Sequence, residues 1–90
     1  MAELSEEVMV VNPLGMHARP AAALVQTTLK FQSDITIHFK GNMVNAKSIM
    51  GLLTLSAGRG SRMMVNCSGP DADEAMKAVR ELFDAGFGEK

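Results

Sequence analysis

Hydrophobic and polar positions along the chain follow two periods, one typical of strands and one typical of helices. The clearest alternation runs over Ile35–Lys40, which presents one apolar face and one polar face. Shorter β-rich runs occupy Val8–Val11, Met43–Asn45 and Arg62–Cys67. Strands with a single apolar face predict a mostly antiparallel sheet that is covered on one side.

Three segments with helical spacing lie between and after these strands. The first follows Pro20, and the second covers 48–55 with Ser48 as its N-cap. In the third, Asp71 and Glu74 have the spacing of a capping box, and Gly86 is a plausible end. The apolar stripes are Ala21, Leu24, Val25, Thr28 and Leu29 in the first helix, and Ala75, Met76, Val79, Leu82 and Phe83 in the third. The order β-α-β-β-α-β-α predicts an α+β two-layer sandwich in a single domain spanning 1–90.

Composition and charge narrow the class of protein. The chain has 90 residues, 47% of them hydrophobic, and a formal net charge of −1, so it has no general attraction to nucleic acid or acidic membranes. It has no apolar run long enough to span a bilayer, and we expect no secretory signal. Cys67 is the only cysteine, and we expect it to be buried and reduced. These features favour a cytoplasmic protein without nucleic-acid or membrane partners.

Candidate chemistry begins at the segment GMHARPAAA, residues 15–23. Proline is tolerated in the first turn of a helix, so the helix begins either at Pro20 or earlier, with His17 as the N-cap. In both cases His17 and Arg19 flank the positive end of a helix, where backbone N–H groups attract an anion. The guanidinium of Arg19 adds a donor fork that suits phosphate oxygens.

These residue types are those that a phosphohistidine site needs. A neutral imidazole is a good nucleophile, and the helix end with Arg19 could hold the charge of a phosphoryl group on it. The residues alone leave the alternative open that His17 is a capping or surface histidine and Arg19 a solvated charge. His38 lies on the polar phase of its strand, and we expect it to be solvated. No ligands at metal-site spacing are evident, and we expect no metal and no cofactor.

The short helix at 48–55 is too apolar for a segment that buries only one face. If Leu52 and Leu55 point inward, then Met50 and Leu53 lie near the surface, where an apolar patch is typical of a docking site. The alternative is that another element covers the patch. Ser48 could carry a phosphate at the helix start, although it could equally be an unmodified cap.

Two motifs and the closing segment together resemble one family. GMHARPAAALVQ, AKSIMGLLTLS after a glycine-containing hairpin, and GPDADEAMKAVRELF are similar, in unbroken order over nearly the whole chain, to HPr, the histidine phosphocarriers of the bacterial phosphoenolpyruvate-dependent phosphotransferase system. The resemblance implies an open-faced β-sandwich, a four-stranded antiparallel sheet with three helices on one face. It also implies a carrier of phosphoryl groups rather than a free-standing enzyme, and we expect a monomer.

The resemblance also implies roles for individual residues. His17 matches the histidine that is phosphorylated on Nδ1 by phospho-Enzyme I and that passes the group to an Enzyme IIA domain for sugar uptake. Arg19 matches the arginine that steadies the phosphoryl group. Ser48 matches the regulatory serine modified by HPr kinase/phosphorylase in species that have it. The matching partner-binding residues are Ala18, Ile49, Met50 and Leu53.

Two branches of the system remain open from the sequence. KSIMG is more similar to carriers regulated by the serine kinase, whereas ELFDAGF is more similar to carriers of the nitrogen-related branch. The alternative function is therefore a regulatory or nitrogen-branch carrier that acts mainly through its phosphorylation state.

Overall fold

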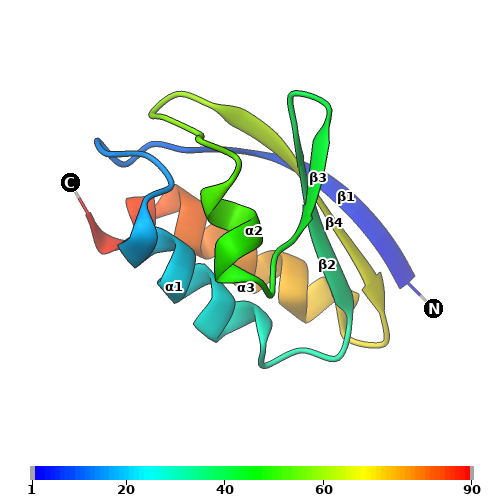
Figure 1. Cartoon of the computed structure of the whole chain (residues 1–90). Helices are drawn as coiled ribbons and strands as arrows, with labels where there is room; N and C mark the ends of the chain where they lie inside the picture. Colours follow the sequence, from blue (N-terminus) through cyan, green and yellow to red (C-terminus); the bar gives the residue numbers. More distant parts are fainter. Residues whose placement is uncertain (1, 90) are drawn as a thin grey trace.

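The computed structural model describes residues 2–89 and shows one twisted sheet with helices on one of its faces (Figure 1). The predicted order of elements is confirmed, with one turn of 3-10 helix added near the C-terminus. The elements are β1 (Ala2–Met9), α1 (Ala18–Thr28), β2 (Asp34–Phe39), β3 (Asn42–Asn45), α2 (Ile49–Leu53), β4 (Arg62–Gly69), α3 (Ala72–Asp84) and η1 (Gly86–Gly88).

The sheet has the strand order β1-β4-β2-β3, and every neighbouring pair is antiparallel. Alternate residues of each strand face the helices, as with Ile35, Ile37 and Phe39 of β2. The residues between them face away from the helices and stay open to solvent. The two-layer α+β sandwich predicted from the strand patterns is confirmed, and so is the open-faced β-sandwich that the resemblance implies.

The core lies between this sheet and the helices. Phe83 and Val79 of α3 and Leu24 of α1 are fully buried against it, and each such side chain contributes about 1.5–3 kcal/mol of transfer free energy. Cys67 is also fully buried in the described structure. Its burial, followed by the charges of Glu6 and Asp71, raises the pKa of the thiol to about 11. The thiol is therefore protonated at neutral pH, and the expected buried role of Cys67 is confirmed.

The first strand differs from the sequence prediction. Strand β1 covers Ala2–Met9 and pairs with β4 along its length, whereas the prediction placed it at Val8–Val11. Its helix-facing side includes Glu6, which reaches α3 and pairs with Arg80 at 2.9 Å, so the alternation of apolar residues is interrupted. Val10 lies beyond the strand but still exchanges backbone hydrogen bonds with Gly60 and Ser61.

Of the two predicted starts for the first helix, the structure has the earlier one. His17 is the N-cap of α1 and Pro20 is its third residue. The helix ends at Thr28, and Leu29, which was expected on the apolar stripe, is 62% exposed. The buried hydroxyl of Thr28, the last residue of α1, donates a hydrogen bond to the carbonyl of Ala46 at 2.9 Å. This bond ties the end of α1 to the segment that follows β3.

The third helix begins after Asp71 as predicted, but the predicted capping box does not form. The carboxylate of Asp71 makes no cap hydrogen bond within α3. It accepts instead from the backbone N–H groups of Gln32 and Ser33, both at 2.9 Å, and from the Ser33 hydroxyl. These bonds lower the pKa of Asp71, and the bond from the Ser33 hydroxyl contributes most to that shift. Asp71 thus fastens the start of α3 to the loop before β2, which no local pattern could show.

Candidate functional site

The first helix begins with an open end. His17 has extended backbone angles and makes no side-chain cap hydrogen bond to the helix. The N–H groups of Ala18 and Arg19 precede the first intrahelical bond, in which Ala21 donates to the carbonyl of His17 at 3.0 Å. Pro20 has no N–H to offer. Two backbone donors and the positive end of the helix dipole therefore face outward beside the imidazole.

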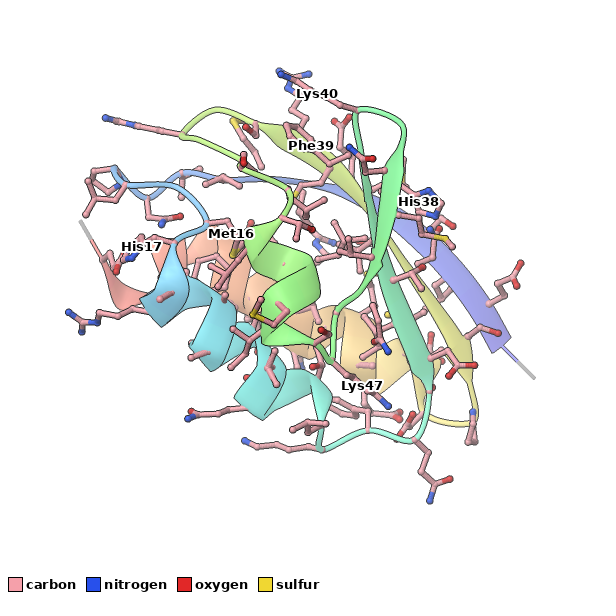
Figure 2. The ribbon with its side chains drawn as sticks, in the orientation of Figure 1. Met16, His17, His38, Phe39, Lys40 and Lys47 are labelled. Atoms are coloured by element: carbon pink, nitrogen blue, oxygen red, sulfur yellow. The ribbon has the colours of Figure 1, made fainter. Side chains whose placement is uncertain are left out.

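A glycine fixes the segment that leads into this end. Gly15 has a φ of +72°, and a Cβ there would lie 2.5 Å from the carbonyl oxygen of Ala57. The next residue, Met16, is buried and its N–H donates to the same carbonyl at 2.8 Å. Figure 2 shows the labelled Met16 and His17 in succession where α1 begins. The close contact with the 57–58 loop thus sets where His17 emerges.

The imidazole of His17 is held from the far end of the chain. Its Nε2 lies 2.9 Å from Oε1 of Glu89, and the side chain of His17 is 31% exposed. The hydrogen bond with His17, and after it the bond from Asn12 and the charges of His17 and Arg19, lower the pKa of Glu89. Glu89 is therefore an ionised acceptor at neutral pH, and the proton lies on Nε2. In the neutral form of the ring, the lone pair then lies on Nδ1.

The buried side chain of Asn12 hydrogen-bonds to two parts of this arrangement. It is 1% exposed, and its amide donates to the carbonyl of Gly15 at 2.7 Å and to Oε1 of Glu89 at 3.1 Å. One buried amide therefore joins the turn before His17 to the carboxylate that orients the ring. Sequence reasoning did not single out Asn12 for a role beyond the turn, and it did not find Glu89, which lies 72 residues from His17.

Arg19 is exposed on the first turn of α1. Its charge contributes to the lowered pKa of Glu89, which places the guanidinium within electrostatic reach of the same cluster. The structure therefore brings His17, Ala18 and Arg19 together at one helix start, as the sequence spacing predicts, and adds Glu89 and Asn12 to them.

The second helix begins differently. Ser48 is its N-cap, as predicted, and the hydroxyl accepts from the N–H of Gly51 at 3.1 Å. Its hydroxyl therefore bonds within α2 and not to the groups around His17. Helix α2 lies beside α1 (Figure 1), and the two pack together.

The exposed apolar residues of α2 agree in part with the prediction. Leu52 is fully buried, whereas Met50 is 72% and Ile49 40% exposed. Leu53 is half-buried and packs against the core. Leu14, in the turn before His17, is 75% exposed and was not singled out from the sequence. Its signal was an apolar residue inside a turn that otherwise consists of asparagine, proline and glycine.

The described residues contain no metal centre built from the commonest ligand side chains. Within residues 2–89 no group of three or more His, Cys, Asp and Glu side chains could hold a metal ion. The same part of the chain contains no helix long and apolar enough to cross a membrane.

Comparison with known proteins shows the family to which this chain belongs. The family model of the HPr component phosphorylation site of the phosphotransferase system matches residues 4–85. The phosphocarrier protein HPr of Xylella fastidiosa (strain 9a5c) is 50% identical over 86 residues, which cover 96% of this chain and 97% of that protein. The chain belongs to the HPr family, the phosphocarriers of the phosphotransferase system.

Solved structures support the same assignment. The crystal structure of HPr-C-His from Thermoanaerobacter tengcongensis superposes with a TM-score of 0.90 at 41% identity, covering 100% of this chain and 99% of that one. A second structure from that organism, described as an HPr dimer, has a TM-score of 0.78 at 45% identity and covers 83% of this chain and 86% of that one. The open-faced β-sandwich is therefore the fold of the family.

Proposed function

We propose that the protein accepts a phosphoryl group on Nδ1 of His17 from phospho-Enzyme I and passes it to a histidine of an Enzyme IIA domain. The observation that carries this proposal is the 2.9 Å contact between Nε2 of His17 and Glu89 at the open start of α1. It leaves Nδ1 as the nucleophilic nitrogen of the neutral ring. In this role the protein is an acceptor and donor rather than a free-standing enzyme.

The transfer needs little covalent chemistry from the protein. The Nδ1 lone pair attacks phosphorus, and the N–P bond to the donor histidine breaks. The proton on Nε2 stays in place, because the ionised Glu89 accepts its hydrogen bond. Transfer to the acceptor repeats the same exchange with His17 as the leaving group. The contribution of this chain is to position one nitrogen in line and to stabilise charge.

The anionic group is held by few contacts. The N–H groups of Ala18 and Arg19, the helix end and the guanidinium of Arg19 surround the position beside His17. A helix end is worth about 0.3–1 kcal/mol to an anion at an exposed site. The nearby carboxylate of Glu89 opposes tight binding. A carrier benefits from this balance, since a strongly bound phosphoryl group would not move on.

We further propose that Ala18, Ile49, Met50 and Leu53 dock both partners in turn. The exposure of Met50 and Ile49 on the helix packed beside α1 supports this surface. Methionine suits it because its flexible side chain adapts to partners of different shape. One surface that serves two partners must be free between encounters, and for this reason we propose the monomer as the working form.

We also propose that phosphorylation of Ser48 regulates docking. A phosphate on its hydroxyl would stay at the start of α2 and introduce negative charge next to Ile49 and Met50. The expected effect is weaker docking with an intact fold. A regulatory module acting through Ser48 alone is the second candidate function, and it predicts partner binding that survives His17→Ala.

The deciding experiment is phosphorylation with Enzyme I, Mg²⁺ and phosphoenolpyruvate, followed by intact-mass measurement and ³¹P NMR. We expect one added phosphoryl group that is acid-labile and base-stable, with a phosphoramidate signal. His17→Ala should abolish it. Equal labelling of His17→Ala would show that the site is wrong. ATP-dependent, acid-stable labelling of Ser48 without any transfer to His17 would favour the regulatory module.

A further inference from the structure

The face of the sheet that points away from the helices carries an unusual row of side chains. Register places Met64 of β4 and Met43 of β3 directly opposite His38 of β2, one on each side. All three belong to the exposed phase of their strands. Figure 2 shows His38 at the sheet, far across the molecule from His17. Two thioethers therefore flank one imidazole on the open face.

Packing in the core does not explain these methionines. Met43 is 63% exposed and Met64 is 39% exposed. The neighbouring row on the same face is wholly polar, with Ser5, Asn66, Thr36 and Asn45 opposite one another. A core-filling explanation fails for side chains that lie on the face away from the core.

The distances of a sheet allow the three groups to converge. Directly opposite residues have Cβ atoms about 4.5–5.5 Å apart. A methionine side chain has three rotatable bonds beyond the backbone, so both sulfurs can turn toward a nitrogen of the central imidazole. The sequence hides this set, because its members are separated by five and twenty-six positions.

We propose that Met43, His38 and Met64 form a binding site for a soft monovalent cation, namely Cu(I). Thioether sulfur and neutral imidazole together select Cu(I) over hard cations, which prefer carboxylate and carbonyl oxygens. Glu7, which lies opposite Met64 at the end of the row, adds negative charge on the β1 side. The site lies on the open face of the sheet and does not involve the residues proposed for phosphoryl transfer.

The test uses Ag(I) as a redox-inert probe and Cu(I) in competition with a chromophoric chelator. With one equivalent of Ag(I), methionine-methyl and histidine NMR signals of Met43, Met64 and His38 should shift together and saturate. His38→Gln should weaken binding by about 10–100-fold, the loss typical when a metal site is perturbed. Replacing both methionines, as Met43→Leu with Met64→Leu, should abolish saturable binding. Backbone NMR spectra should show that each variant keeps the fold.

Matched variants separate this row from other soft ligands. Met50→Leu removes a thioether that is more exposed but lies on α2, outside this row. Cys67→Ala removes the buried thiol. Both variants should bind Ag(I) as the unmodified protein does. Unchanged affinity in His38→Gln would overturn the proposal. Loss of binding in Cys67→Ala, or Zn²⁺ binding at equal affinity, would overturn it as well.

Discussion

The starts of α1 and α2 are the same kind of local structure used in opposite ways. Ser48 closes its own helix, since its hydroxyl accepts from Gly51 N–H. His17 occupies the equivalent N-cap position of α1 but leaves the helix end open and turns its Nε2 to Glu89. The comparison teaches that a helix start becomes available for an anion when the cap residue is held by something other than its own helix.

The largest expected effect comes from disturbing the approach to the open end. Gly15→Ala places a Cβ 2.5 Å from the carbonyl oxygen of Ala57 at a φ of +72°, and the strain and overpacking should cost about 2–5 kcal/mol of unfolding free energy. Urea denaturation would measure it. Gly58→Ala is the matched control, because a Cβ there meets nothing within 4 Å, and it should change stability by at most about 0.5 kcal/mol. Equal losses in both variants would contradict the account of Gly15.

The next largest effect concerns the phosphoryl group that we propose the open start of α1 holds. Arg19→Ala should slow phosphoryl transfer from Enzyme I by about 10²-fold, the range for removing one preorganised charge-stabilising group. Arg62→Ala removes an arginine on the far face of the sheet and should leave the rate unchanged. Rapid-quench measurement of phosphohistidine formation gives both numbers. A rate in Arg19→Ala that matches Arg62→Ala would remove Arg19 from the proposed site.

A direct test of the comparison replaces each cap by alanine. Ser48→Ala loses a real cap hydrogen bond and should destabilise the protein by about 0.5–2 kcal/mol. His17→Ala removes no cap hydrogen bond within the helix, and its loss should stay below that of Ser48→Ala. Thermal unfolding of the two variants at pH 7 decides the order. A larger loss in His17→Ala would mean that its contact with Glu89 stabilises the fold more than a cap does.

The smallest expected effect depends on pH. The pKa of Glu89 is lowered in the folded protein, mainly by its hydrogen bond with His17. Its contribution to stability is therefore complete above the ordinary value of 4.5 and is lost as the pH falls through the lowered value. Wild type should lose its advantage in Tm over Glu89→Gln in that acidic range. Glu3→Gln, on the open face, should show no such convergence, and a parallel course of both variants would contradict the role of Glu89.

Most of the fold could be predicted because its signals are local. The alternation of β2, the hairpin at Gly41 and the serine at the start of α2 each lie within a few residues. The errors fall where a distant contact decides the outcome. Strand β1 is longer than its apolar run because β4 pairs with its polar part. The side chain of Asp71 makes no cap hydrogen bond in α3 because its carboxylate accepts instead from the N–H of Gln32.

In the candidate site, too, some features follow from the local sequence and others depend on distant contacts. The positions of His17, Ala18 and Arg19 at one helix start follow from the local segment GMHARPAAA. Their connection to Glu89 does not, because only the packing of α3 and the turn at Gly86 bring the chain back to that point. The exposure of Met50 was foreseen from crowding, whereas that of Leu14 depends on how its turn sits on the surface.

The placement of Glu89 has a practical consequence for anyone who labels or fuses this protein. A purification tag or fluorophore joined just after Glu89 would hang directly on the carboxylate that lies 2.9 Å from Nε2 of the imidazole. Figure 1 places the beginning of β1 at the other end of the sheet, remote from the start of α1. Reporters of transfer kinetics therefore belong at the N-terminus, where they leave the chemistry undisturbed.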